Sequence, residues 1–354
     1  MDTMPTTLNT VARLLTTPLV PQDFIDLVNP LASGTDLRGR IEAIKPETAS
    51  GTSATLRIRL GRGWGGHRAG QYVRLGIDID GVRQWRTYSI TSSPRQTSHI
   101  TVTVTAIPGG LVSNYLVREA TVGTLVHLDQ AAGEFMLPAR LPDKLLFVTA
   151  GSGITPVMGM LRAHAETLGD VVLVHSARSP DDVVFGQELR ALARDGAIRL
   201  IEHHTIGRPR LTARELTEVV PDWRRRDAWA CGPGGLLDDL ENQYTAAGLE
   251  TKLRTERFRA AAVSTGDGGP VSFTRSGVTA ETATGATLLE AGEEAGVLMP
   301  SGCRMGVCFG CVVPLRRGVV RDVRNGDLTS ANPGDGVLVQ TCISAAAGPC
   351  QLDI

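Results

Sequence analysis

Four cysteines near the C-terminal end of the chain have a spacing that could bind iron. Three of them form Cys303-x4-Cys308-x2-Cys311, and Cys342 follows later in the sequence. Thiolates in this order hold a [2Fe-2S] cluster, in which one loop wraps the cluster and a distant segment closes it. The glycines between these cysteines let the backbone curl and direct N–H groups at sulfur, which helps to set the reduction potential. We therefore predict that these four residues are cluster ligands.

A zinc site and ordinary structural thiols are the alternatives for the same cysteines. Zinc modules usually combine one Cys-x2-Cys pair with a second close pair or with histidines. Cys350 has no place in the pattern and is expected to be a small buried residue. The segment 300–311, Pro-Ser-Gly-Cys-Arg-Met-Gly-Val-Cys-Phe-Gly-Cys, resembles the cluster loop of plant-type ferredoxins. That resemblance implies an α+β fold of the β-grasp type over residues 271–354.

Two further segments have residue types that suit a flavin nucleotide. The first is Arg86-Thr87-Tyr88-Ser89. Here an arginine would neutralise a diphosphate, a tyrosine ring would stack on the isoalloxazine, and a serine hydroxyl would hydrogen-bond near flavin N5. The second, at the start of a predicted helix, is Gly110-Leu111-Val112-Ser113. Its glycine permits close backbone approach, and helix N–H groups can hold a phosphate. An ordinary strand arginine and a glycine turn are the alternative.

Together the two segments are similar to the flavin site of the ferredoxin-NADP reductase superfamily. This resemblance implies that FAD is the flavin and that both segments bind it. It also implies that Tyr88 and Ser89 lie beside the reacting ring.

A glycine turn between a predicted strand and a predicted helix could hold a dinucleotide. It is Gly151-Ser152-Gly153-Ile154-Thr155-Pro156. Its amides would face a diphosphate at the helix N-terminus, and proline suits the first helical turn. A second segment, Ala230-Cys231-Gly232-Pro233, ends a later strand. Both segments are similar to the nicotinamide site of the same superfamily. This resemblance implies that Cys231 lies near the nicotinamide and that Thr155 lies near both rings and contacts FAD. Both residues would then position the reactants. The alternative for Cys231 is a buried packing residue.

The choice of coenzyme depends on the residues that follow the strand ending near His175. An acidic residue there would bind the ribose 2′-hydroxyl of NADH, whereas an arginine would accept the 2′-phosphate of NADPH. The chain continues with Ser176 and Arg178, and the acidic Asp181 and Asp182 come later. We therefore expect NADPH, with NADH as the alternative.

The elements that must position these residues fall into a multidomain pattern. Residues 38–140 alternate apolar and polar positions in short segments, which predicts an antiparallel β-barrel. The resemblance of the two flavin segments implies that this barrel binds FAD. Residues 141–258 alternate apolar strands and helices, which predicts an α/β nucleotide domain with a parallel sheet. Residues 259–270 have the composition of a flexible linker before the ferredoxin domain at 271–354. Residues 1–37 are an N-terminal extension, which we expect to be helical.

Composition excludes several other classes of protein. The chain of 354 residues has 36 basic and 37 acidic residues, so it lacks the basic surface of a nucleic-acid binder. It has no run of about 20 apolar residues for a membrane span and no recognisable export signal. We expect a cytoplasmic protein, in which clustered cysteines favour metal over disulfides.

The domain order resembles oxygenase reductases of the phthalate dioxygenase reductase type. A nicotinamide gives up a pair of electrons, whereas this type of cluster accepts electrons singly, and FAD can connect the two. The resemblance implies an NAD(P)H reductase whose protein acceptor is a desaturase, hydroxylase or oxygenase. The N-terminal extension looks like that of actinobacterial reductases for membrane acyl-CoA desaturases. This resemblance favours a di-iron desaturase or alkane hydroxylase as the acceptor. The chain would then associate peripherally with the membrane through that acceptor. A Rieske dioxygenase, a cytochrome P450, or a non-catalytic redox-sensing or electron-carrier subunit remain alternatives.

Overall fold

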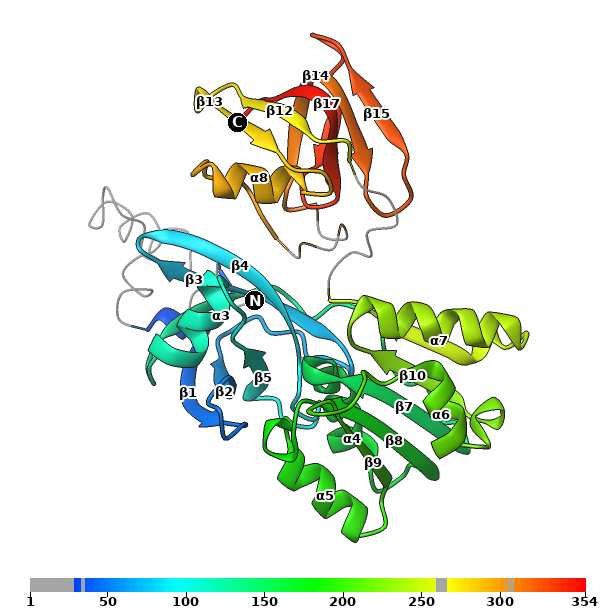
Figure 1. Cartoon of the computed structure of the whole chain (residues 1–354). Helices are drawn as coiled ribbons and strands as arrows, with labels where there is room; N and C mark the ends of the chain where they lie inside the picture. Colours follow the sequence, from blue (N-terminus) through cyan, green and yellow to red (C-terminus); the bar gives the residue numbers. More distant parts are fainter. Residues whose placement is uncertain (1–28, 33–35, 259–265, 303, 305, 307–308) are drawn as a thin grey trace.

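The structure is a computed structural model that describes residues 29–32, 36–258, 266–302, 304, 306 and 309–354. Three sheets form three modules in chain order (Figure 1). Most of the predicted N-terminal extension, residues 259–265 of the predicted linker, and the predicted ligands Cys303 and Cys308 lie outside the described residues.

The first module is a closed antiparallel barrel, as predicted. Its strands are β1 (Arg38–Pro46), β2 (Ser53–Leu60), β3 (Tyr72–Ile79), β4 (Val82–Ser89), β5 (His99–Thr105) and β6 (Leu125–Leu128). They are hydrogen-bonded in the order β4-β3-β6-β1-β2-β5, and a bridge between Ile90 and Val102 joins the two ends. Alternate apolar side chains fill the interior because successive strand residues point to opposite faces. The short helices α3 (Leu111–Asn114) and η2 (Tyr115–Glu119) bury Val112 and Leu116 in this core, and η1 (Pro30–Ala32) precedes the barrel.

The second module has a parallel five-stranded sheet with helices on both faces. Its strands are β7 (Lys144–Ala150), β8 (Asp170–Ala177), β9 (Arg199–His204), β10 (Asp227–Cys231) and β11 (Leu253–Glu256), in the order β11-β10-β7-β8-β9. Its helices are α4 (Ile154–His164), α5 (Gly186–Arg194), α6 (Ala213–Val219) and α7 (Gly234–Ala246), with the short turns η3 (Gly151–Gly153), η4 (Pro180–Asp182), η5 (Trp223–Arg225) and η6 (Glu250–Lys252).

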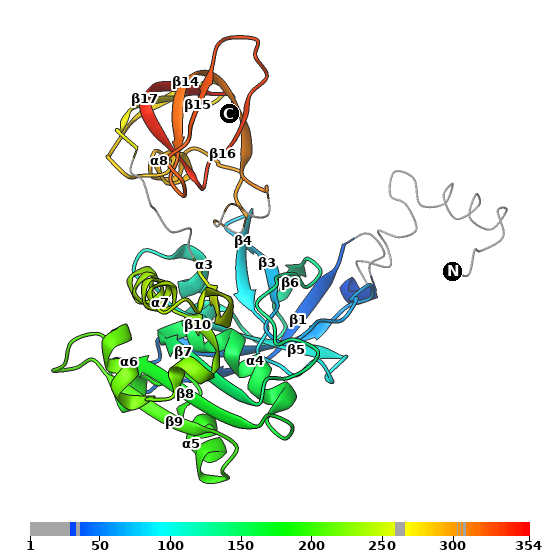
Figure 2. The same cartoon turned by 90° about the vertical axis from the view of Figure 1, so that its right-hand side faces the viewer.

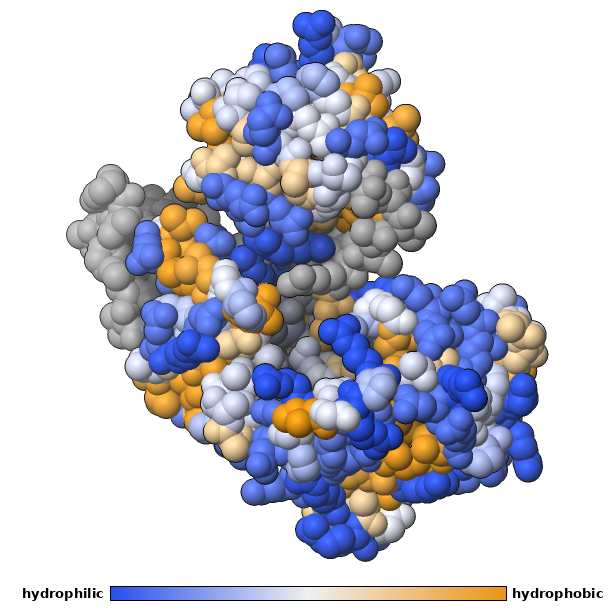
Figure 3. Space-filling model, viewed as in Figure 1, coloured by the Kyte–Doolittle hydropathy of each residue, from blue (hydrophilic) through white to orange (hydrophobic). Residues whose placement is uncertain are grey.

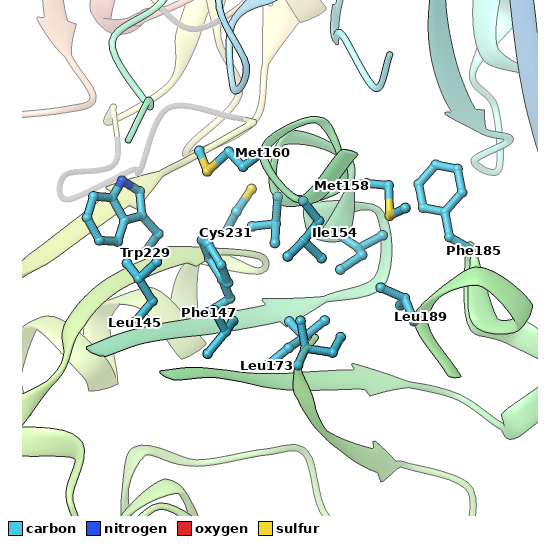
Figure 4. Close-up of a cluster of buried hydrophobic side chains, with 14 of the residues drawn as sticks. Leu145, Phe147, Ile154, Met158, Met160, Leu173, Phe185, Leu189, Trp229 and Cys231 are labelled. Atoms are coloured by element: carbon cyan, nitrogen blue, oxygen red, sulfur yellow. The ribbon is translucent and has the colours of Figure 1, made fainter. Parts of the chain in front are cut away.

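The apolar strands of this sheet are buried on both faces, as a parallel sheet requires. Leu145 and Phe147 of β7 pack in one cluster with residues of α4 and α5 (Figure 4). The alternate residues Leu146 and Val148 pack in a second cluster with α6 and α7. Strand β7 therefore packs against a helical layer on each face of the sheet. This packing fixes the position of the turn from β7 into α4.

The barrel and the nucleotide module pack directly against each other. The Arg162 guanidinium on α4 donates to the carbonyl oxygen of Thr91 in the barrel at 2.8 Å. A Cβ on Gly159 of α4 would lie 2.6 Å from the carbonyl oxygen of Ile90, so glycine is required for this close approach. The Trp229 indole N–H also crosses the interface, donating to the carbonyl oxygen of Met136 at 3.2 Å. These contacts hold the ends of β4 and α4 together.

The third module is a mixed sheet with one helix, as the β-grasp expectation requires. Its elements are β12 (Gly269–Phe273), β13 (Val278–Thr282), α8 (Leu288–Glu294), β14 (Val312–Asp322), β15 (Leu328–Ala331), β16 (Leu338–Gln340) and β17 (Ser344–Leu352). Strands β12 and β17 are parallel, and the other pairs are antiparallel. A capping box between Thr287 and Glu290 starts α8. Seen from the side, this module lies beyond one end of β4 (Figure 2).

Candidate cofactor sites

A large cleft lies where the three modules meet, and Figure 3 shows the hollow. Its volume is about 2280 Å³. It brings together these predicted site residues: Arg86, Thr87, Tyr88, Ser89, Gly110, Leu111, Val112, Ser113, Thr155 and Cys342. Met299, Pro300 and Arg304 of the ferredoxin module line its other side. The predicted flavin residues and one predicted cluster ligand therefore share one cleft.

The end of β4 fits an anionic, aromatic ligand such as FAD. Burial, followed by the nearby charge of Arg304, lowers the pKa of Arg86, which shows that this guanidinium is partly desolvated. The hydroxyl of Thr87 is buried without a hydrogen-bond partner among the described residues. A desolvated cation and an unpaired hydroxyl on a cleft wall suit a diphosphate group. Burial also raises the pKa of Tyr88, so its phenol stays neutral and can stack on a ring.

The turn before α3 is shaped by its own side chains. A Cβ on Gly110 would lie 2.4 Å from the Ser113 Oγ, so only glycine fits. The Ser113 hydroxyl donates to the Gly110 carbonyl at 3.2 Å and accepts from the Ile107 N–H at 3.3 Å. The Asn114 side-chain amide also donates to the Gly110 carbonyl and to the Ile107 carbonyl. The structure thus uses the Ser113 hydroxyl to hold the turn, while Leu111 is exposed on the cleft wall.

The turn from β7 into α4 has the form that a dinucleotide diphosphate needs. Gly151 has a positive φ of 54°, and a Cβ on Gly153 would lie 2.0 Å from the carbonyl oxygen of Cys231. The first N–H of α4, that of Ile154, already donates to the Gly151 carbonyl, so the amides that a phosphate could reach are those of η3, which no side chain caps. The Thr155 hydroxyl donates to the Ser152 carbonyl at 2.9 Å. Ile154 and Pro156 are buried in the core.

Cys231 and Glu256 lie side by side at the ends of β10 and β11. Their Cα atoms are register partners, and Cys231 is fully buried (Figure 4). Burial and the Glu256 carboxylate raise the pKa of the Cys231 thiol, so it fits a positioning residue better than a nucleophile. Gly232 and Pro233 follow and lead into α7. Cys231 does not line the cleft, whereas Glu256 does.

Glu256 lines the cleft but is not among the site residues predicted from the sequence. Burial raises the pKa of its carboxyl group to about 8, and its Oε2 has no hydrogen-bond partner among the described residues. At neutral pH this group is therefore mostly protonated and can donate a hydrogen bond into the cleft. The sequence carries the residue in Glu256-Arg257-Phe258, but it does not show that the carboxyl group is buried.

The carboxyl ends of β8 and β9 meet at the predicted coenzyme-selecting residues. Ser176 is buried, and its hydroxyl lies 3.2 Å from the Nδ1 of His203. Arg178 is exposed, and its carbonyl accepts from the Ile206 N–H at 3.0 Å. Asp182, in contrast, accepts hydrogen bonds from the hydroxyls of Ser179 and Ser50. The Arg178 side chain is thus exposed, whereas the Asp182 carboxylate is hydrogen-bonded within the protein.

Cys311 and Cys342 lie together at the start of β14 and just beyond β16. Both are buried, and a hydrogen bond from Cys342 lowers the pKa of Cys311 to about 6. Thr341 ties the two strands through hydrogen bonds from its N–H and hydroxyl to the Cys311 carbonyl, at 3.1 and 3.0 Å. Two adjacent sulfur atoms, one of them readily ionised, are a donor set that suits iron. This pairing fits the [2Fe-2S] cluster that the spacing predicts.

Three of the described residues before Cys311 have left-handed backbone. Arg304, Gly306 and Phe309 all have a positive φ, of 59°, 76° and 56°. Left-handed backbone at non-glycine residues is uncommon and costs energy. Left-handed residues can turn neighbouring backbone groups toward one centre, which suits the binding of a cluster.

The cluster loop is electrostatically linked to the flavin site. Arg304 forms an ion pair with Glu293 of α8. The charge of Arg304 lowers the pKa of Arg86, and the charge of Glu293 raises it. The cluster loop and the predicted flavin-binding arginine are therefore close enough to influence each other across the cleft.

Within the described ranges, no helix has the length and apolar character needed to cross a bilayer.

Comparisons with protein families match all three modules. Residues 41–136 match the oxidoreductase FAD-binding domain, residues 147–242 the oxidoreductase NAD-binding domain, and residues 272–347 the 2Fe-2S iron-sulfur cluster binding domain. The matches confirm the predicted order and the FAD, NAD(P) and [2Fe-2S] cofactors.

Known proteins align with most of this chain. The NADPH oxidoreductase of Mycobacterium tuberculosis is 45% identical, over 98% of this chain and 92% of the relative. The glycine betaine monooxygenase reductase subunit of Pseudomonas aeruginosa is 30% identical, over 81% and 87%. The solved structure of phthalate dioxygenase reductase has the same fold, with a TM-score of 0.63 at 23% identity over 90% of this chain and 98% of that one. The chain therefore belongs to the ferredoxin-NADP reductase superfamily, as an FAD- and NAD(P)-binding oxidoreductase with a C-terminal [2Fe-2S] ferredoxin domain.

Proposed function

We propose that this chain takes electrons from NADPH and delivers them singly, through FAD and the [2Fe-2S] cluster, to a separate protein acceptor. The observation that carries the proposal is the single cleft that contains Arg86, Tyr88 and Thr155 on one side and Cys342 on the other. Bound FAD would supply the ability to accept an electron pair and to release electrons one at a time.

The protein's own contribution is to bind and orient the reactants. Arg86 would neutralise the FAD diphosphate and Tyr88 would support the ring. The amides of the Gly151–Gly153 turn would hold the coenzyme diphosphate, and Thr155 would position the nicotinamide against the flavin. Protonated Glu256 would donate a hydrogen bond to a carbonyl group in the cleft.

NADPH is the proposed coenzyme because a cation is exposed where β8 ends. Arg178 would accept the 2′-phosphate. Backbone hydrogen bonds from Thr205 and Ile206 to the carbonyls of Ala177 and Arg178 hold the loop after β9 against this segment. That loop carries Arg208 and Arg210, which are also exposed and would add positive charge.

The proposed acceptor is an oxygenase or a desaturase. Reductase subunits of monooxygenases among the relatives, including the glycine betaine monooxygenase subunit, support this class. Within it, we propose a membrane di-iron acyl-CoA desaturase or alkane hydroxylase, which rests on the resemblance of the N-terminal extension. A Rieske dioxygenase and a cytochrome P450 are the competing acceptors.

Loss of one cluster ligand should stop electron transfer through the cluster and leave electron transfer from NADPH to FAD intact. In Cys342→Ser we expect NADPH-driven reduction of cytochrome c to fall by about 100-fold or more, because that acceptor takes electrons from the cluster. Ferricyanide reduction, which needs only the flavin, should stay within about twofold. Steady-state rates of both reactions measure this. Cys350→Ser is the matched control and should keep both activities. Full cytochrome c reduction by Cys342→Ser would refute the proposed path.

Removal of the exposed cation at the end of β8 should reduce the preference for NADPH. We expect Arg178→Ala to lower kcat/KM for NADPH by about 10- to 100-fold, since a charged hydrogen bond contributes about 1.5–3 kcal/mol, and to leave the value for NADH unchanged. Arg194→Ala, an exposed arginine at the end of α5, is the control. An unchanged ratio of the two kcat/KM values would show that Arg178 does not recognise the phosphate.

The buried carboxyl group of Glu256 should make stability depend on pH. Its folded pKa of about 8 lies above the ordinary value of 4.5, so the wild type loses stability as pH rises from about 4.5 to about 8. Glu256→Gln lacks this loss. Its free energy of unfolding relative to the wild type should therefore increase over that window and level off above it.

Urea unfolding of the FAD-loaded chain at several pH values measures this difference. Glu250→Gln, which removes an exposed carboxyl group on η6, should show no such increase. A difference between Glu256→Gln and the wild type that is independent of pH would contradict the buried, protonated assignment.

A further inference from the structure

An arginine outside the cysteine motif is held in one orientation next to the cluster loop. Arg324 lies in the turn between β14 and β15. Three groups of Arg324 donate hydrogen bonds to the Asp322 carboxylate: the backbone N–H at 2.8 Å, Nε at 3.1 Å and Nη2 at 2.7 Å. Three bonds to one carboxylate fix both the backbone and the side chain of Arg324, so the direction of its Nη1 is also fixed.

The Nη1 end of Arg324 is directed at the loop that follows Cys303. It lies 2.9 Å from the point that a Cβ on Gly306 would occupy. Ile343 packs on the same point, with methyl groups at 2.8 and 3.0 Å, and Gln340 donates to the Gly306 carbonyl at 3.1 Å. Arg324 is therefore part of the packing against Gly306, between two predicted cluster ligands in the sequence.

The same guanidinium is close enough to a predicted ligand to feel its charge. The Cys342 sulfur raises the pKa of Arg324, after the larger contribution of Asp322. Cys342 is buried and hydrogen-bonded to Cys311. Arg304, the other arginine of this region, is instead paired with Glu293 toward the flavin side. Arg324 is thus a second cation near the predicted ligands, and it comes from a different part of the fold.

We propose that the Arg324 guanidinium, oriented by Asp322, raises the reduction potential of the [2Fe-2S] cluster. A fixed positive charge at the ligand shell stabilises the state with the added electron, because reduction makes the cluster more negative. The Asp322 carboxylate offsets part of this charge, but it binds the Nε and Nη2 side, while Nη1 faces the loop. Arg324 would act on the cluster only through its charge and would not be a ligand. The inference rests on the proposed assignment of the four cysteines as ligands.

Redox titration of the full-length, FAD- and cluster-loaded protein tests this proposal. The cluster potential is followed by the paramagnetic signal of its reduced form and the FAD potential by visible absorbance. In Arg324→Gln and Arg324→Met we expect the equilibrium constant for one-electron reduction of the cluster to fall about three- to tenfold, where tenfold corresponds to 59 mV. Arg324→Lys keeps the charge and should shift the potential less. The FAD potential should not change in any of them.

Arg317→Gln is the matched control, because it removes one exposed positive charge from β14 of the same module. It should leave the cluster potential at the wild-type value. Two neutral variants are included so that poor cluster loading in one leaves the other as the test. A loaded neutral variant with the wild-type potential, or an equal shift in Arg317→Gln, would overturn the role of Arg324. A wild-type chain that holds no cluster after reconstitution would instead refute the ligand assignment.

Discussion

A partly desolvated guanidinium at the junction of the three modules is the constraint on which the rest of the site depends. Arg86 lies within the barrel strand β4 and lines the common cleft, and the charges of Arg304 and Glu293 in the ferredoxin module shift its pKa. Keeping a cation away from water is costly unless an anion or a dipole compensates. In the function that we propose, the FAD diphosphate would supply that compensation, complete the site and help the barrel and the ferredoxin module lie together.

Two kinds of contact position the reacting groups around Arg86. Between the barrel and the nucleotide module, Arg162 and Gly159 bring α4 against the barrel at backbone distance, which leaves little room for relative movement. Between the barrel and the ferredoxin module, across the cleft, the interaction described above is electrostatic and involves the long side chains of Arg86, Arg304 and Glu293. The first arrangement suits transfer between two stacked rings, which needs close and fixed geometry. The second suits transfer of single electrons to a module that also has to serve an external acceptor.

The sequence predicted the features whose cause is local. The turn at Gly151 and Gly153 was predictable because only glycine permits the backbone conformation and the approach to Cys231 that the structure shows. The fold class was predictable from the change of apolar periodicity at the end of the barrel. The burial of Glu256 was not, because it depends on the pairing of β11 with β10. Arg324 was also missed as a cluster neighbour, since its position follows from the turn that Asp322 builds after β14.

The central claim is that one chain carries electrons from the coenzyme across the cleft to the cluster. Anaerobic addition of one equivalent of NADPH to the purified, loaded protein tests it most directly. We expect the visible flavin absorption to bleach first and the paramagnetic signal of a reduced [2Fe-2S] cluster to appear afterwards in the same sample. Bleached flavin with a cluster that stays oxidised, although dithionite can reduce it, would contradict the claim.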